Sequence, residues 1–306
     1  MGLTNFQNGI SSFGVPVHGS GDLTTTGNVY FVDSGQANAS DSHKGTDSKK
    51  ALLTLDAAVG KCTANNGDII VLMPGHAESV TTAAAIDLDV AGITIKGFGS
   101  GSSRPTFTFD TTTSVDIDID AANITIENVL FEAGIDAVAA AIDVNATDFT
   151  LRNCEFRDTT GYKTALWIDV PLVASTGEAD RLRIEGCTVK QNLVAGAASF
   201  VRLMGGHDGL VIKDNNIRGN YSVSPISNTS TALTNLKLEA NIVENTNATN
   251  LCVTLLGTTD GTISDNHFRS TSSIVTITAD NDCSLFENYV VTTDGRTGVL
   301  LGTLTT

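Results

Sequence analysis

The sequence predicts an all-β fold, a solenoid of the parallel β-helix type, and two repeated patterns support this prediction. The first pattern is a six-residue phrase with apolar residues at its first and sixth positions and mostly polar residues at its second and third. Seven copies start 22 to 33 residues apart, with no helical periodicity between them. Short β-phrases at such a period stack as coils that share one core. The copies begin at Ile126, Leu151, Ile184, Ile212, Leu238, Ile263 and Leu285.

The second pattern is a short β-segment that precedes most copies of the phrase. These segments are rich in β-branched and apolar residues, and the clearest of them alternate apolar with polar residues, as strands with one buried face do. Two or three short strands in each turn of about 25 residues describe a parallel β-helix. The segments are Val115–Ile119, Ala141–Val144, Ala165–Val170, Phe200–Leu203, Cys252–Leu255 and Ile274–Ile277.

The fourth position of the phrase predicts an asparagine ladder inside the solenoid. Equivalent residues of stacked coils lie about 4.8 Å apart. Inward asparagines at this spacing can pass amide hydrogen bonds from coil to coil and satisfy buried backbone groups of the turn. Because asparagine is common in turns, any single match has a simpler explanation. The fourth residues are Cys154 and Cys187 in two earlier copies and Asn215, Asn241, Asn266 and Asn288 in the last four.

One short helix is predicted near residues 54–64, where it would cap the open first coil. Leu55, Ala58 and Val59 share one helical face, Thr54 can cap the first turn, and the segment 65–67 (Asn-Asn-Gly) ends the helix. Without a cap, the first coil would expose an apolar cross-section and a row of unpaired strand groups.

The opening of the solenoid and its repeats together resemble a known group of proteins. Tyr30–Asp33, a Gly- and Ser-rich loop, Ala51–Val59 and Gly67–Gly75 follow one another, and the repeats come after them. This arrangement resembles the right-handed parallel β-helix proteins of the pectate-lyase-like superfamily, over roughly residues 28–291. The resemblance implies a single-stranded, right-handed β-helix. It also brings polysaccharide lyases and glycoside hydrolases into consideration.

Residues 1–27 are predicted to form an extended N-terminal arm, and residues 292–306 a short C-terminal tail or cap. The arm is rich in Gly, Ser and Thr, yet it carries spaced apolar residues that a purely solvated tail lacks. These residues either fold back on the first coil or bind another protein, and we expect partner binding. They are Phe6, Ile10, Phe13, Val15 and Val17.

The segment Leu3–Val17 resembles the N-termini of tailed-bacteriophage structural proteins. It begins Leu-Thr-Asn-Phe, continues Asn-Gly-Ile-Ser-Ser-Phe-Gly after one variable residue, and ends Pro-Val after another. The resemblance covers this segment alone. It implies a shared address within a virion, followed by a variable β-rich body.

Charge and composition exclude several classes of function. The net charge is −16 and the pI is about 4.5, so binding along a phosphate backbone would be repelled and no nucleic-acid partner is expected. No run of apolar residues is long enough to cross a membrane, and no secretory signal is visible. The five cysteines are an odd set and are predicted to be reduced core residues. Synthesis in a host cytoplasm agrees with these features.

Two sets of polar residues could support catalysis. Asp118, Asp143 and Asp169 are predicted to align on consecutive coils, either as a solvated acidic stripe or as a Ca²⁺ site, and the stripe is the expectation. His207 and Asp208 partly resemble a turn of pectin-degrading hydrolases, but the accompanying motifs of those enzymes are not found. No metal-ligand spacing or nucleotide loop appears either. We therefore expect no catalytic residues, no metal and no cofactor.

Two hypotheses from different classes follow. The first is a non-enzymatic virion structural protein, a capsid decoration or cement protein on the capsid surface. Its partners would be the major capsid protein or other virion subunits, and the resemblance implies a homotrimer. The alternative is a tailspike-type module that binds or degrades glycans.

Overall fold

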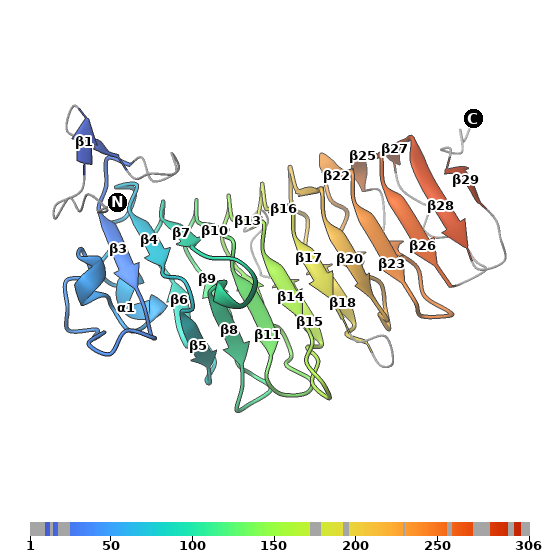
Figure 1. The fold of residues 1–306 in the computed structure, drawn as a ribbon. Helices are drawn as coiled ribbons and strands as arrows, with labels where there is room; N and C mark the ends of the chain where they lie inside the picture. Colours follow the sequence, from blue (N-terminus) through green and yellow to red (C-terminus); the bar gives the residue numbers. More distant parts are fainter. Residues whose placement is uncertain are drawn as a thin grey trace, which may run out of the picture.

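The computed structural model describes residues 10–12, 15–17, 25–171, 179–191, 196–228, 230–255, 259–271, 282–292 and 297–300. Over these residues the chain forms a right-handed parallel β-helix, as the sequence predicts. Three sheets surround one continuous apolar core. Figure 1 shows the coils following one another in chain order, from β3 at one end of the solenoid to β28 at the other.

The first sheet contains the opening residues of every six-residue phrase. These apolar residues pair in register on neighbouring strands, from Ile126 with Leu151 to Ile263 with Leu285. The predicted phrase is therefore the structural repeat. In hydrogen-bonded order the strands are β3 (Val29–Val32), β4 (Ile69–Leu72), β7 (Thr94–Gly97), β10 (Thr125–Glu127), β13 (Thr150–Arg152), β16 (Arg183–Glu185), β19 (Val211–Lys213), β22 (Leu236–Glu239), β25 (Asp260–Ser264) and β27 (Asp282–Phe286).

The second sheet contains the closing residues of the phrases. Phe131 pairs with Phe156, and the column continues to Phe268 and Val290. All its strands are parallel except the last, which runs antiparallel to its neighbour. The strands are β5 (Ala77–Val80), β8 (Thr106–Phe109), β11 (Leu130–Ala133), β14 (Glu155–Arg157), β17 (Thr188–Lys190), β20 (Asn216–Gly219), β23 (Ile242–Asn245), β26 (His267–Ser270), β28 (Asn288–Thr292) and β29 (Thr297–Leu300).

The third sheet is formed by the segments that precede the phrases. Five of the six predicted segments contain a strand, and the sixth, Ile274–Ile277, lies outside the described residues. The sequence did not predict β21, because Pro225 precedes it and two of its three residues are polar. The strands are β6 (Ile86–Leu88), β9 (Ile117–Ile119), β12 (Ile142–Val144), β15 (Leu166–Val170), β18 (Ser199–Leu203), β21 (Ile226–Asn228) and β24 (Val253–Thr254).

A left-handed residue makes the corner between the first and second sheets. The third position of all seven phrases has a positive φ, where Gly, Asn and Asp are the least strained residues. Four of the seven are Asn or Asp and one is Gly, so backbone conformation explains much of this polar position. The residues are Asn128, Asn153, Gly186, Asp214, Ala240, Asp265 and Glu287, with φ between 48° and 66°.

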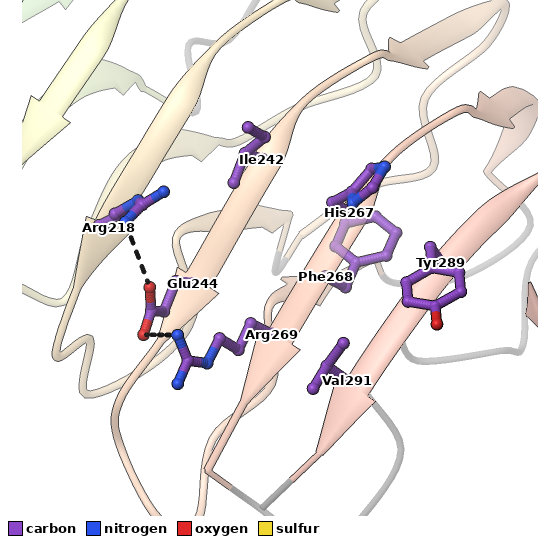
Figure 2. Close-up of a pocket in the computed structure, with 8 residues that line it drawn as sticks. All are labelled: Arg218, Ile242, Glu244, His267, Phe268, Arg269, Tyr289 and Val291. Carbon is purple, nitrogen blue, oxygen red and sulfur yellow. Dashed lines mark ion pairs between the residues drawn. The ribbon is translucent and has the colours of Figure 1, made fainter. Parts of the chain in front are cut away.

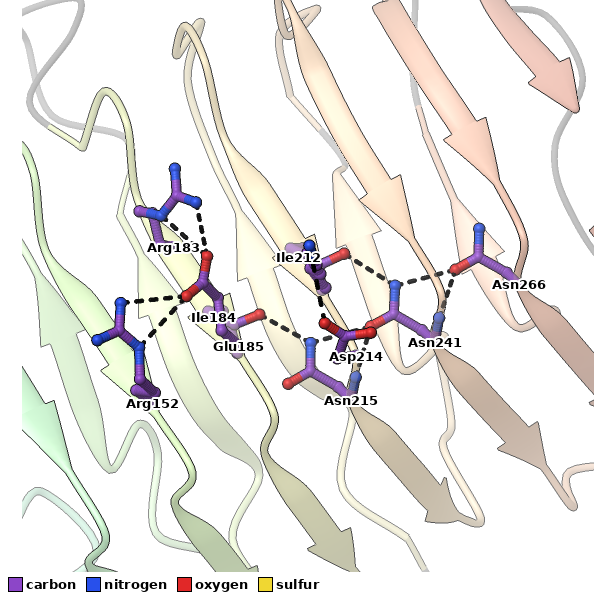
Figure 3. Close-up of polar contacts among 10 residues, drawn as sticks. Arg152, Arg183, Ile184, Glu185, Ile212, Asp214, Asn215, Asn241 and Asn266 are labelled. Carbon is purple, nitrogen blue, oxygen red and sulfur yellow. Dashed lines mark hydrogen bonds and ion pairs between the residues drawn. The ribbon is translucent and has the colours of Figure 1, made fainter.

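The asparagines of the next position form a buried column (Figure 3). The amide Nδ2 of Asn215 donates to Oδ1 of Asn241, and that of Asn241 donates to Asn266, each at 2.9 Å. Beyond the residues labelled in the figure, Nδ2 of Asn266 donates to Oδ1 of Asn288, also at 2.9 Å. Each Nδ2 also donates to a main-chain carbonyl of the preceding coil, as Asn241 does to Ile212 at 2.8 Å. The four side chains are at most 1% exposed. Coil-to-coil amide bonds therefore satisfy backbone groups that would otherwise be buried unpaired.

Aromatic side chains fill the core in the middle coils. The ring of Phe156 lies 5.0 Å from that of Phe131, 5.1 Å from Phe200 and 5.4 Å from Trp167, between centroids. Because Phe131 lies on the second sheet and Trp167 and Phe200 lie on the third, Phe156 joins these two sheets across the core. At Phe200, β18 has a bulge, since the N–H groups of Phe200 and Val201 both donate to the carbonyl of Pro225.

The N-terminal end differs from the coils. β1 (Ile10–Ser12) and β2 (Val15–Val17) form an antiparallel two-stranded sheet of their own, so this part of the predicted extended arm is a hairpin. Within the predicted range 54–64, the structure has a single helix of five residues, α1 (Leu55–Val59). The side chain of Thr54 accepts a hydrogen bond from the N–H of Ala57, and Leu55, Ala58 and Val59 are buried. Two 3₁₀ turns, Ser48–Lys50 and Gly101–Ser103, complete the elements.

Two further findings concern membrane insertion and cysteine chemistry. Among the helices of the described chain, none is long and apolar enough to be a candidate membrane span. All five cysteines are free thiols, and Cys154, Cys187 and Cys252 are buried. Burial raises the pKa of the Cys252 thiol to about 12, so it is a poor nucleophile.

Candidate functional site

A row of outward-facing aspartates crosses the third sheet. Asp87, Asp118, Asp143 and Asp169 occupy equivalent positions on β6, β9, β12 and β15, with buried apolar residues on both sides of each. The predicted alignment of Asp118, Asp143 and Asp169 is confirmed by this register. Since neighbouring strands are about 4.8 Å apart, the carboxylates are close enough to repel one another.

Arg202 ends the row of carboxylates. It pairs in register with Asp169, and its Nε and Nη2 atoms donate to the two carboxylate oxygens, with 2.8 Å between Nε and Oδ1. Asp169 is only 5% exposed, whereas the side chain of Arg202 is 40% exposed, so the carboxylate is the buried partner of this bidentate ion pair. The same positions on the next two strands carry Ser227 and Thr254.

Asp116 joins Asp118 and Asp143 in a cluster of three. Carboxylate oxygens of the three residues all lie within 4.8 Å of one another. Two oxygens bound to one Ca²⁺ ion, each at 2.3–2.6 Å, are at most about 5 Å apart. The three carboxylates therefore lie at a separation that a hard divalent cation can bridge.

Burial raises the pKa values of these three carboxyl groups, and mutual repulsion adds to the rise at Asp118 and Asp143. Burial is the largest cause in each case and raises the pKa of Asp118 to about 6 and that of Asp143 to about 7. Repulsion by Asp169 and Asp116 adds to the rise at Asp143, and the guanidinium of Arg202 opposes it. Oδ1 of Asp143 is buried without a hydrogen-bond partner among the described residues, which removes the stabilisation that an ionised carboxylate needs.

We expect Asp143→Asn to stabilise the protein at neutral pH. The unfolded carboxyl loses its proton near pH 3.8, whereas the folded one keeps it to about pH 7. The folded state therefore binds more protons in this window, and the free energy of unfolding falls as the pH rises through it. Because Asp143 is partly exposed to solvent, the gain in the free energy of unfolding is smaller than the full pKa shift implies. We expect about 1–2 kcal/mol near pH 8 and close to zero near pH 4. Chemical denaturation across this pH range, in EDTA, measures it.

Asp148→Asn is the control with the opposite sign. A hydrogen bond from Arg181 lowers the pKa of Asp148, so its neutralisation should give no gain near neutral pH. If Asp143→Asn and the parent chain unfold at the same denaturant concentration across the whole pH range, the row does not destabilise the fold.

The structure separates the side chains of His207 and Asp208. The imidazole of His207 is 2% exposed, and its Nε2 lies 2.6 Å from the carbonyl oxygen of Met204. The carboxylate of Asp208 instead accepts hydrogen bonds from Thr234 and Asn235, which lower its pKa. The imidazole of His207 therefore bonds within its own turn, whereas Asp208 bonds to residues of the next coil. The two side chains are not arranged as an acid–base pair.

Three of the five predicted partner-binding residues lie in described strands, and two lie outside the described residues. Ile10 belongs to β1, and Val15 and Val17 belong to β2. Phe6 and Phe13 lie outside the described residues. Their contact with a partner remains a prediction.

Two carboxylates of the site were not predicted from the sequence: Asp87 of the acidic row and Asp116 of the cluster of three. Asp87 lies in Ile-Asp-Leu, the same alternation that surrounds Asp118 and Asp143, so this signal was present in the sequence. Asp116 lies two residues before Asp118 in the predicted segment Val115–Ile119, so the alternation of this segment places both on one face, and this signal was also present in the sequence.

Comparisons with known proteins give no family. No protein-family model matches the sequence, and no curated protein matches it. Among solved structures, the chain is similar to the GH136 lacto-N-biosidase from Eubacterium ramulus, as the selenomethionine derivative and as the native protein. Both alignments cover 86% of this chain and 68% of that chain, with identities of 12% and 13% and TM-scores of 0.47 and 0.45. A similarity of this size supports no conclusion about function.

Proposed function

We propose that this chain is a non-enzymatic structural protein of a tailed-bacteriophage virion, a decoration or cement protein attached to the capsid surface by its N-terminal residues. The observation that carries the proposal is the separate sheet formed by β1 and β2, which, among the described strands, pair with each other and with no strand of the solenoid. Figure 1 places β1 at the end of the solenoid where β3 begins. The resemblance of Leu3–Val17 to phage structural proteins supports the same role.

The solenoid suits the role of a stiff body. Its sheets are held by in-register parallel pairing, and the Asn215–Asn288 column adds side-chain bonds between coils. The net charge of −16 favours solubility and keeps free copies apart. In this proposal the partner is the major capsid protein or another virion subunit. A homotrimer would present three N-terminal segments and bind by avidity.

Removal of residues 1–20 should abolish attachment while the solenoid stays folded. The truncated chain keeps every strand of the three solenoid sheets, so its circular dichroism and its unfolding midpoint should match those of the full chain. Both forms are added to purified shells that lack this protein, and occupancy is counted by electron microscopy. We expect occupancy to fall by at least about tenfold, because the anchoring contacts are gone.

A length-preserving pair of variants provides the control. Phe6→Ser with Phe13→Ser removes two apolar anchors, whereas Asn5→Ser with Asn8→Ser changes the same segment without removing any. Attachment should be lost in the first variant and retained in the second. A folded, truncated chain that still decorates shells at full occupancy would show that the N-terminal residues are not the anchor.

Glycan cleavage is the second candidate, and one observation favours it. Asp143, with a pKa raised to about 7, lies beside Asp169, whose carboxylate is held by Arg202. A carboxyl group that keeps its proton to near neutral pH can serve as a general acid. Release of reducing ends or unsaturated uronides from bacterial polysaccharides, lost in Asp143→Asn, would favour this candidate over the first.

A further inference from the structure

We propose that Asn66–Gly67 is a site of spontaneous deamidation, and that this modification weakens the end of the solenoid where the chain enters its first coil. The two residues lie just before β4 in an exposed turn, and Asn-Gly pairs are typical of turns. The sequence contains one other such pair, Asn8–Gly9. The proposal goes beyond a role in a virion and holds whether or not the chain decorates a shell.

Deamidation joins the side-chain carboxamide of an asparagine to the next main-chain nitrogen. Here the nitrogen of Gly67 attacks Cγ of Asn66, the new N–Cγ bond closes a succinimide ring, and the Cγ–Nδ2 bond breaks. The proton of the Gly67 N–H leaves with Nδ2 as ammonia. Water then opens the ring at either carbonyl, which gives aspartate or, where the main chain runs through Cγ, isoaspartate. The reaction therefore needs no reactant besides solvent water.

The turn leaves this attack open. Gly67 has no side chain to shield its nitrogen, and its φ of 76° is a conformation that glycine adopts without strain. Its N–H donates no hydrogen bond to any residue that the structure describes. Nδ2 of Asn66 donates to Oδ1 of Asp68 at 2.7 Å. Because this bond spans the residue between its two partners, it holds the carboxamide close to the Gly67 peptide group.

Asp68 connects the segments that open the solenoid. Its side chain is buried, and the residue is 0% exposed. Oδ1 accepts a hydrogen bond from the main-chain N–H of Asn28 at 2.6 Å, and Oδ2 accepts one from the N–H of Thr63 at 2.7 Å. Since Asn28 directly precedes β3, this carboxylate fixes the point where the predicted arm, residues 1–27, joins the first coil.

Deamidation replaces a hydrogen-bond donor of this carboxylate with a negative charge. The Nδ2 group that donates to Asp68 is lost, and the carboxylate of either product repels the buried one. In isoaspartate the main chain is also longer by a carbon atom, which displaces the Gly67 carbonyl that accepts a hydrogen bond from the hydroxyl of Thr25. We therefore expect the bonds from Asn28 and Thr63 to open more often.

Peptide mapping of the full chain tests the reaction. The folded chain and the chain unfolded in guanidinium chloride are incubated in mildly alkaline buffer, and isoaspartate is located by mass spectrometry. We expect it at residue 66 of both samples, at least about tenfold above Asn65, which is followed by Asn66 instead of glycine. Asn66→Gln should remove the signal, because glutamine closes a larger ring more slowly, and Asn8–Gly9 is the positive control. Absence of isoaspartate at residue 66 of the folded chain, or a level no higher than at Asn65, overturns the proposal.

Hydrogen exchange followed by NMR tests the effect on the fold. Asn66→Asp places the carboxylate of the product beside Asp68. Asn65→Asp is the matched control, because it adds the same charge at the neighbouring residue, which is not among the hydrogen-bond partners of Asp68. The amides of Asn28 and Thr63 should exchange at least about tenfold faster in Asn66→Asp than in the parent chain, and at the parent rate in Asn65→Asp.

The amide of Glu244 is the distant reference for this experiment. It lies on β23, far along the solenoid from β3, and its side chain pairs with Arg218 at 4.0 Å and Arg269 at 3.5 Å (Figure 2). Its exchange should be the same in all three chains, because the change is confined to the first coil. Parent rates at Asn28 and Thr63 in Asn66→Asp would overturn the proposal. An equal rise at Glu244 would overturn it as well, since the whole fold rather than its first coil would then be weakened.

Discussion

Replacing Asn241 with Leu should destabilise the protein by about 3–5 kcal/mol, since several buried polar groups lose their partners at once. Oδ1 of Asn241 accepts hydrogen bonds from the main-chain N–H and the side-chain amide of Asn215, at 3.0 and 2.9 Å. Its Nδ2 donates to the carbonyl of Ile212 and to Oδ1 of Asn266. Leu has a similar volume but can replace none of these bonds. The change in the free energy of unfolding is measured by chemical denaturation.

Two related variants test whether the column itself is responsible. Asn216 directly follows Asn215, in the coil next to that of Asn241, and its side chain is partly exposed. Asn216→Leu should therefore destabilise the protein much less than Asn241→Leu. Asn288→Leu, at the end of the column, should cost less than Asn241→Leu, because Asn288 donates to a single carbonyl and to no further asparagine of the column. A loss below about 1 kcal/mol for Asn241→Leu would contradict the role assigned to the column.

Phe156→Ala should also cost about 3–5 kcal/mol, through lost apolar burial and the cavity left behind. Its fully buried ring contacts rings on both sides of the core, Phe131 on the second sheet and Trp167 and Phe200 on the third. The main chain can move little to fill the cavity left by the ring, because in-register pairing holds β14 to its neighbours β11 and β17. The unfolding midpoint in denaturant measures the loss.

The controls for this substitution separate size from aromatic character. Phe156→Leu keeps most of the volume and should cost less than the alanine variant. Phe286→Ala removes a ring that is 57% exposed and should change stability by less than about 0.5 kcal/mol. Equal effects of Phe156→Ala and Phe286→Ala would show that the aromatic contacts of the core contribute little.

The repeat could be predicted because the alignment of the phrases in the sequence sets which residues of successive coils pair in the solenoid. In a solenoid, equivalent residues of successive copies become neighbours in space, so aligning the phrases aligns the strands. Ile126 with Leu151 and Asp118 with Asp143 are pairs of this kind. The left-handed third position was visible as a polar preference, but Ala240 and Glu287 weaken that pattern, since neither is typical of positive φ.

Features that depend on turns rather than repeats could not be predicted in this way. β21 carries too few apolar residues to be recognised, yet it takes its place because the coils before and after it supply pairing partners. The pairing of β1 with β2 has no counterpart among the repeats, so the period of the solenoid does not predict it. The ion pairs of Glu244 with Arg218 and Arg269 needed the register of the second sheet, because these residues follow the phrases rather than lie inside them.

The antiparallel pairing of β29 with β28 has a consequence for self-assembly. An open edge strand presents unpaired N–H and C=O groups, and a second copy can add to it as it would to a growing fibril. β29 covers this edge along Asn288–Val291, so the second sheet terminates with a strand from its own chain. The reversed direction also breaks the parallel template that every earlier coil offers to the next. Copies that meet at this end of the second sheet therefore meet the antiparallel strand β29 in place of the parallel edge of β28.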